Sequence, residues 1–169
     1  MNKVFGIVGW KNSGKTTLVS ALVREFTNRG LCVSTIKNSH HSFSIDVPGT
    51  DSFGHREAGA HEVALVSSKR WALMHELHTD GAMPSLETMI AKMAPCDLIL
   101  VEGFKSSSIQ KIETFRSDAS SEPPLWQTHD RIVALAADSP HEGCNLPQFA
   151  LDDIVNIADF IAQISGLRF

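Results

Sequence analysis

The sequence predicts an α/β protein in which helices flank a mostly parallel β-sheet. Apolar, strand-like segments alternate with amphipathic, helix-like segments along the 169 residues, and this alternation favours parallel strands joined by helices. The segments 97–101 and 132–136 are almost continuously apolar, which is typical of strands buried on both faces of a parallel sheet. With 43% hydrophobic and 20% charged residues, the composition fits one globular domain spanning 1–169.

The predicted elements follow a regular order along the chain. A strand over 4–8 leads through a glycine-rich loop to a helix over 17–26, after which Gly30 provides a stop. Apolar residues at helical spacing predict a helix that begins at Ser85 and ends before Pro95. The remaining expected elements are a strand over 31–37, a short helix from Asp51 to Gly59, a β-hairpin at an edge over 62–67 and 70–74, an exposed or edge strand over 111–116, and a last helix with Asp152 as its N-cap.

The loop between the first strand and the first helix carries the strongest functional signal. Gly9–Thr16 matches G-x-x-x-x-G-K-[ST] at every fixed position, between a strand and a helix as the motif requires. Gly9 and Gly14 let backbone N–H groups point at a phosphate, and the helix N-terminus adds partial positive charge. Lys15 is expected to reach the β- and γ-phosphate oxygens, and the Thr16 hydroxyl to bind Mg²⁺. This predicts the fold of a P-loop NTPase; the alternative is a glycine turn that only begins a helix.

Two carboxylates follow buried strands and are candidates for the same site. Glu102 ends the strand 97–101, where it is expected to hold a metal-bound water, and the Gly103 N–H is expected to approach the γ-phosphate. Asp138 follows the strand 132–136 and is a candidate reader of a guanine base. A solvated strand-end acid is the alternative for Glu102, and an ordinary turn for Asp138. Lys105 is expected to meet a phosphate or a partner, or to lie in solvent.

The polar loop from Lys37 to Ser52 is expected to overhang the phosphate site, because it follows the second strand. Asp46 and Asp51 are candidates to orient an attacking water or a Mg²⁺ water, as in a switch segment ordered by the γ-phosphate. The alternative is that one of these aspartates caps the following helix. His40 and His41, with His55 and His61 nearby, open a further alternative of transition-metal binding.

Charge and cysteine content narrow the function classes. The net charge of −4 argues against a nucleic-acid binder, which needs a basic face. The apolar stretch before the glycine loop is too short for a signal peptide, and no apolar run reaches the length of a membrane span. Three widely spaced cysteines predict neither a disulfide framework nor a zinc site. We therefore expect a cytoplasmic protein with no membrane or nucleic-acid partner.

Taken together, these segments resemble the family of molybdopterin-guanine dinucleotide biosynthesis adapter proteins (MobB). The glycine loop alone indicates only a nucleotide binder. The resemblance becomes specific through the I-K-N-S-H-H segment at 36–41, the spacing D-x-x-G-x-D-S from Asp46 to Ser52, the segment R-W-A-L-M at 70–74, and V-E-G-F-K at 101–105.

The resemblance implies a GTP-binding protein with weak GTPase activity that acts mainly as an adapter and forms a homodimer. Its implied partners are the guanylyltransferase that joins GMP to molybdopterin and molybdopterin-carrying proteins. From the loop residues themselves, the expected catalytic residues are Lys15, Asp46 and Asp51. The resemblance implies that Mg²⁺ is held by Thr16 and Glu102, and that GTP is held by Gly9, Asn12, Ser13, Gly14, Lys15, Thr16, Thr17, Gly103 and Asp138.

The sequence departs from the pattern of related P-loop proteins at two points. A second signature lysine would have to stand at Trp10, so hydrolysis stimulated by such a lysine is not supported. The residues before Asp138 are Leu-Ala-Ala, not the usual guanine-recognition element, which leaves GTP and ATP both open. A P-loop small-molecule kinase, a metallochaperone GTPase and a binding module without turnover stay open as alternatives.

Overall fold

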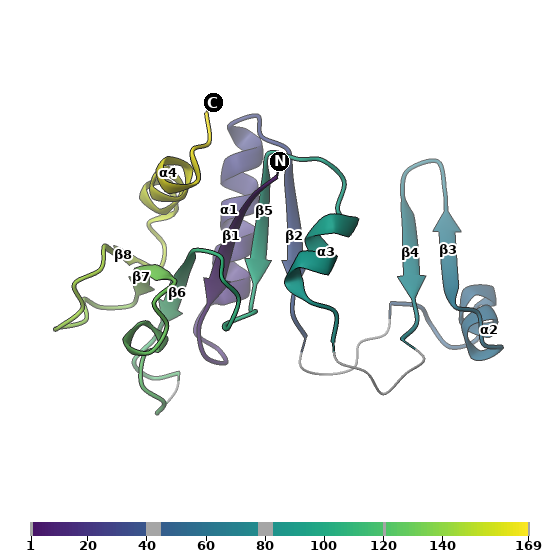
Figure 1. The fold of residues 1–169 in the computed structure, drawn as a ribbon, viewed down its shortest axis with the longest axis horizontal. Helices are drawn as coiled ribbons and strands as arrows, with labels where there is room; N and C mark the ends of the chain where they lie inside the picture. The colour runs from purple at the N-terminus through teal and green to yellow at the C-terminus, as the bar shows by residue number, and fades with distance from the viewer. Residues whose placement is uncertain (1, 40–44, 78–82, 120, 169) are drawn as a thin grey trace. The chain divides into compact units, whose positions relative to one another are not determined.

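Six parallel strands form the main sheet of the computed structural model, which describes residues 2–39, 45–77, 83–119 and 121–168 (Figure 1). Their order across the sheet is β2-β5-β1-β6-β7-β8. Neighbouring strands are parallel at every pairing of this sheet. The strands are β1 (Lys3–Val8), β2 (Val33–Lys37), β5 (Leu98–Glu102), β6 (Lys111–Phe115), β7 (Ile132–Ala137) and β8 (Gln148–Ala150).

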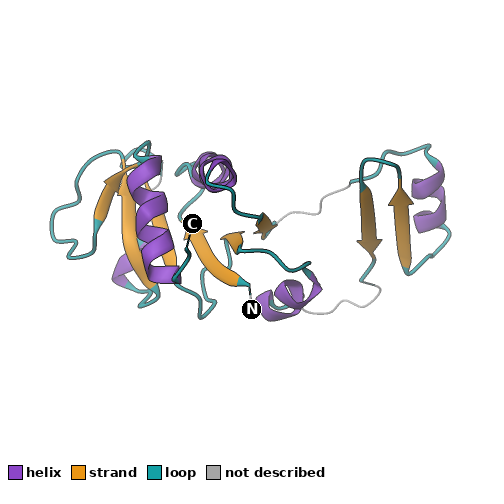
Figure 2. Ribbon diagram, turned by 90° about the horizontal axis from the view of Figure 1, so that it is seen from above, coloured by secondary structure: helices purple, strands orange, loops and turns teal. Residues whose placement is uncertain are grey.

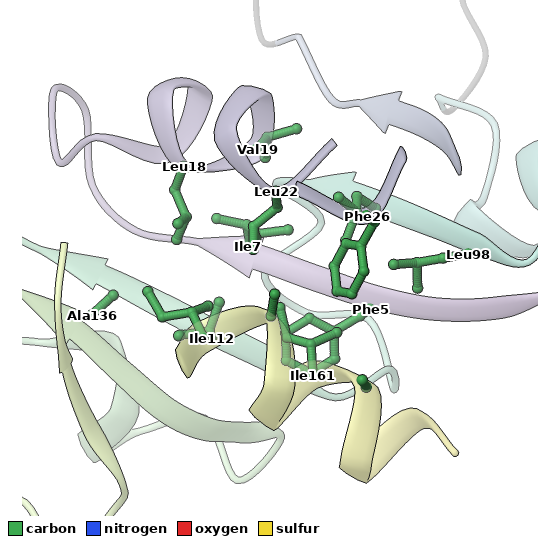
Figure 3. Packing of buried hydrophobic residues seen from close by; sticks show 14 of the residues in the cluster. Phe5, Ile7, Leu18, Val19, Leu22, Phe26, Leu98, Ile112, Ala136 and Ile161 are labelled. Carbon is green, nitrogen blue, oxygen red and sulfur yellow. The ribbon is translucent and has the colours of Figure 1, made fainter. Parts of the chain in front are cut away.

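Helices cover both faces of this sheet. Alternate residues of β1 separate the faces, since Phe5 and Ile7 pack with α1 (Lys15–Asn28) and α4 (Ile154–Ser165), whereas Val4 packs with α3 (Leu86–Lys92). Figure 3 shows Leu22 and Phe26 of α1 and Ile161 of α4 meeting the strand residues in the larger core. The predicted α/β fold with a parallel sheet is therefore confirmed.

The chain divides into two compact units, Met1–Asn38 with Ser85–Phe169, and Ser39–Pro84. The first contains the six-stranded sheet and its helices. The second contains α2 (Asp51–Glu57) and the antiparallel hairpin of β3 (Glu62–Val66) and β4 (Trp71–His75), which confirms the predicted hairpin (Figure 2). The hairpin is a two-stranded sheet of its own. Within the described ranges, no helix combines the length and apolar character needed to cross a bilayer.

The prediction of an exposed or edge strand over 111–116 is wrong. β6 lies inside the sheet between β1 and β7, and Lys111 and Glu113 are fully buried. Their charges made the strand look exposed, but each charge is paired with backbone. Lys111 Nζ donates to the carbonyl oxygens of Ser107 and Ile109, and the Glu113 carboxylate accepts from the N–H groups of Leu125 and Trp126.

Helix starts were predicted with mixed success. Ser85 caps α3, since its hydroxyl accepts from the Thr88 N–H at 3.2 Å, as expected. The last helix begins one residue later than predicted, with Asp153 at the N-cap position instead of Asp152. Thr50, and neither of the two candidate aspartates, caps α2. The three-residue strand β8 was missed, because so short a segment shows no usable alternation.

Candidate phosphate-binding site

The loop from Gly9 to Gly14 joins β1 to α1 and owes its shape to three residues with positive φ. These are Gly9 at 152°, Asn12 at 64° and Gly14 at 98°. A Cβ atom on Gly9 would lie 2.4 Å from the carbonyl oxygen of Thr114 in β6, so only glycine lets the loop pass this close to the neighbouring strand. Gly14 takes the N-cap position of α1 in the left-handed region.

A buried pair of hydroxyls fastens the loop to β6. Thr114 Oγ1 donates to the Val8 carbonyl oxygen at 3.2 Å, so its proton is used there, and Ser13 Oγ lies 2.7 Å from Thr114 Oγ1 as the donor of the pair. Ser13 is only 2% exposed. Its hydroxyl therefore holds the loop in place, and its predicted contact with a phosphate would have to come from the backbone. Thr114 was missed from the sequence, where nothing marks one hydroxyl within a strand.

The Lys15 ammonium lies within the loop at the first residue of α1. Its Nζ donates to the Trp10 carbonyl oxygen at 2.6 Å. Burial lowers the pKa of Lys15, Glu102 raises it, and repulsion from Lys105 and Lys37 lowers it further. A half-buried ammonium beside the N-terminus of a helix is an attractive position for an anion.

Thr16, Glu102 and Lys37 meet at the carboxyl ends of β5 and β2. The Thr16 hydroxyl donates to Glu102 Oε1 at 2.9 Å, and Lys37 Nζ lies 3.1 Å from the same carboxylate oxygen and 3.2 Å from Thr16 Oγ1. Glu102 is 7% exposed. A cation thus already bridges the two oxygens that the sequence assigned to a metal.

The donor set fits a magnesium ion. Neighbouring ligands of an octahedral Mg²⁺ are about 3 Å apart, close to the 2.9 Å between Thr16 Oγ1 and Glu102 Oε1. Asn38 Oδ1 is a buried acceptor without a hydrogen-bond partner among the described residues, and the Asn38 side chain lies against Gly103, next to Glu102. The spacing of the two oxygens suits a hydrated cation here.

The Gly103 N–H is bonded within the sheet in this structure. Its N–H, expected at the γ-phosphate, donates to the Ile7 carbonyl oxygen at 3.0 Å. Its φ of 92° and the 3.0 Å between a Cβ placed on it and the Asn38 Cβ both require glycine. Gly103 therefore shapes the strand end that presents Glu102.

Further cationic groups surround the loop. Lys105 Nζ lies 3.6 Å from the centroid of the Trp10 ring, and the Trp10 indole N–H donates to the Pro123 carbonyl oxygen at 2.9 Å. The Arg116 guanidinium lies 3.6 Å from where a Cβ on Gly14 would be. Arg116 was not predicted as a site residue, although it follows β6 directly and β6 neighbours β1.

Asp138 lies past the end of β7, where the sequence predicted it. Its Oδ2 accepts hydrogen bonds from the Ser117 N–H at 3.1 Å and from the Ser117 hydroxyl at 3.2 Å. One carboxylate oxygen is thus anchored to the end of β6, which orients the other. This arrangement suits an acceptor for an N–H group of a base.

The remaining candidates belong to the second unit or lie outside the described residues. Asp46 accepts a hydrogen bond from Arg56 Nε at 3.4 Å, and Asp51 is the first residue of α2. The His61 ring packs edge-on against His75 with centroids 4.5 Å apart. His40 and His41 lie outside the described residues. Among the described residues, no group of three or more His, Cys, Asp or Glu side chains is arranged to hold a metal ion.

The parallel sheet and the glycine loop at the start of α1 define an α/β protein of the P-loop NTPase-like class. Comparison narrows this class. The family model described as molybdopterin guanine dinucleotide synthesis protein B (MobB) matches residues 4–138, and the chain belongs to this family.

Relatives and solved structures agree with this assignment. The molybdopterin-guanine dinucleotide biosynthesis adapter protein of Escherichia coli K12 is 36% identical over 167 residues, covering 96% of this chain and 93% of that protein. The protein of the same name from Haemophilus influenzae is 37% identical over 158 residues, covering 94% and 86%. The crystal structure of a MobB homologue from Bacillus stearothermophilus has a TM-score of 0.72 at 26% identity, covering 98% of this chain and 99% of that chain.

Proposed function

We propose that this chain is an adapter protein of molybdopterin guanine dinucleotide biosynthesis that binds GTP with Mg²⁺ and hydrolyses it slowly. Membership of the MobB family and the names of its relatives support the pathway. The observation that carries the nucleotide proposal is the hydrogen bond between Thr16 and Glu102 at the carboxyl end of β5, beside a loop after the neighbouring strand β1 that holds the Lys15 ammonium.

Each part of the site has a defined task in this proposal. Backbone N–H groups of the loop from Gly9 to Thr17 receive the phosphates, and Lys15 leaves the Trp10 carbonyl oxygen to meet the anion. Thr16 and Glu102 would hold Mg²⁺, which when bound neutralises phosphate charge. Asp138, oriented by Ser117, accepts from the guanine edge.

Slow turnover belongs to the proposal because the relatives are named adapter proteins and the resemblance implies only weak GTPase activity. The assignment of the attacking water to Asp46 or Asp51 stays a prediction, and the Asp46 carboxylate is already engaged by Arg56. Single-turnover hydrolysis by the variants D46N and D51N tests it, since a residue that orients the water must slow the step when its charge is removed. The guanylyltransferase, molybdopterin-carrying proteins, a cytoplasmic location and a homodimer belong to the same proposal.

Calorimetric titration tests the nucleotide site directly. Non-hydrolysable GTP and ATP analogues are titrated with Mg²⁺ into the native chain, K15A and the control K92A, whose lysine is exposed on α3. We expect GTP to bind more tightly than ATP, K15A to lose at least about tenfold in affinity, and K92A to match the native chain. Equal or tighter ATP binding would reject the role of Asp138, and unchanged binding by K15A would reject the site.

A small-molecule kinase is the second candidate, favoured by the position of Arg116 beside Gly14. Kinases of this fold use such cations to stabilise a phosphoryl group in transfer. The two functions differ in their product. A GTPase releases inorganic phosphate, whereas a kinase yields a phosphorylated acceptor that mass spectrometry detects in a metabolite mixture.

A further inference from the structure

Lys37 occupies a position between the two oxygens of the candidate cation site. Its Nζ lies 3.1 Å from Glu102 Oε1 and 3.2 Å from Thr16 Oγ1, and these two oxygens lie 2.9 Å from each other. The three atoms form a closed triangle in which the ammonium contacts both oxygens. An ordinary surface ion pair needs only the carboxylate, so the additional contact with the Thr16 hydroxyl places the charge in the cation position itself.

The strand register brings Lys37 to this position. Lys37 and Glu102 are direct register partners in the parallel pair β2 and β5, and both are the last residues of their strands. Register partners point to the same face of a sheet. The neighbouring Ile36 packs in the core on the opposite face with Ile99 and Val101. The backbone therefore fixes the Lys37 Cα atom, from which the side chain extends, beside Glu102.

The burial of the two partners is unequal, and this makes the ammonium the exchangeable one. The Lys37 side chain is 57% exposed, whereas the Glu102 side chain is 10% exposed. A carboxylate that is nearly buried needs a positive charge close by, but the exposed lysine can swing into solvent once another cation takes its place. Thr16, Lys37 and Glu102 also line an open groove of about 390 Å³, through which a cation has access.

We propose that Lys37 is a built-in counter-ion that holds the magnesium position in the nucleotide-free protein and gives it up when a metal–nucleotide enters. This inference rests on the proposed function, and it adds a rule for the order of binding. A divalent cation alone must displace the ammonium from Glu102 and offers the displaced ammonium no new partner. A nucleoside triphosphate brings several negative charges, to which the displaced ammonium can turn.

The consequence is that the nucleotide-free chain binds divalent cations weakly because of Lys37. Removal of the ammonium leaves Glu102 nearly buried and without its cation, so the site should then attract a metal. A methionine at this position keeps most of the stem and lacks the charge. An arginine keeps the charge. Lys92 is exposed on α3, and its replacement by methionine changes the net charge equally without touching the site.

The test is a titration of Mn²⁺ into nucleotide-free protein, followed by electron paramagnetic resonance of the free ion. We expect K37M to bind one Mn²⁺ at least about tenfold more tightly than the native chain, since a neighbouring positive charge is removed. K37R and K92M should match the native chain. In the double variant K37M/E102Q the gain should disappear, which assigns the bound ion to Glu102 and not to another surface carboxylate.

Three results would overturn the inference. These are K37M binding Mn²⁺ no more tightly than the native chain, K92M showing the same gain as K37M, or the gain surviving in K37M/E102Q. Circular dichroism verifies the fold of each variant, and K37Q, with a polar side chain suited to the exposed position, repeats the measurement independently. Because no nucleotide is present, these results do not depend on whether the chain binds GTP, which the calorimetric titration decides separately.

Discussion

The close approach of the phosphate loop to β6 makes Gly9 the most demanding position of the loop, and substitution by alanine tests this. A Cβ there would lie 2.4 Å from the Thr114 carbonyl oxygen, 2.5 Å from Ser13 Oγ and 2.6 Å from Thr114 Oγ1. The carbonyl belongs to a strand paired on both sides, to β1 and to β7, so it cannot retreat. The two hydroxyls are hydrogen-bonded to each other in a buried environment.

The expected cost has three parts. Overpacking of a closely packed region costs about 1–3 kcal/mol, and a strained backbone conformation for a non-glycine residue about 1–3 kcal/mol. Displacing the hydroxyls disturbs a buried hydrogen bond, which costs about a further 1–3 kcal/mol. We expect G9A to lower the free energy of unfolding by at least about 3 kcal/mol, the sum of the three lower limits, which is a large share of the roughly 5–15 kcal/mol of a typical domain.

Gly30 provides the matched control. It follows α1 in the same unit with a φ of 86°, and a Cβ placed on it meets no atom within 4 Å. G30A therefore carries the conformational cost alone, about 1–2 kcal/mol. Urea denaturation of both variants, followed by far-ultraviolet circular dichroism, gives the two free energies. If G9A is destabilised no more than G30A, the contact with Thr114 does not determine the residue at position 9.

Three further predictions concern the buried charges and one helix cap. Burial raises the pKa of Glu113, so the folded state holds this proton more tightly than the unfolded chain, and stability falls as pH rises above about 4.5. In urea titrations at a series of pH values, E113Q should remove this fall. The variant should also lose about 1–3 kcal/mol of stability, because its amide oxygen cannot accept from both N–H groups. Burial lowers the pKa of Lys111, so stability should rise with pH in the window just below 10.5, and K111M should abolish that rise. S85A should cost about 1 kcal/mol through loss of the α3 cap, whereas D152A, outside the cap position, should cost less in the same assay.

The sequence predicted those parts of the fold and site that follow from local pattern. The glycine loop, the helix after it and the apolar run ending at Glu102 are each readable within a few residues, because steric and burial requirements act over that range. Glu102 and Thr16 lie in contact because the carboxyl ends of parallel strands meet at one edge of a sheet, and their assignment to Mg²⁺ stays a prediction. The part of the prediction that concerned Asp46 and Asp51 as catalytic groups stays untested.

The errors arose where long-range pairing decides the environment. Lys111 and Glu113 alternate with apolar residues, and this pattern is typical of a strand with one solvated face. Their actual partners are backbone groups at 107 and 109 and at 125 and 126, which no periodicity in 111–115 can indicate. A charge inside a sheet is compatible with folding when backbone groups satisfy it, so charge alone is a poor marker of an edge strand.

Strand order explains why the role of Lys37 could not be read from the chain. The sequence predicted that the second strand ends at Lys37, as it does in the structure, but it assigned the side chain only to the loop over the phosphate site. Because β5 is inserted between β2 and β1, Glu102 has Ile7 as its register partner on one side and Lys37 on the other. The phosphate loop extends from β1, so the same insertion sets Glu102 between the loop threonine and the lysine of the edge strand. A different order of the same strands would leave the sequence unchanged and would separate Lys37 from Glu102 and Thr16.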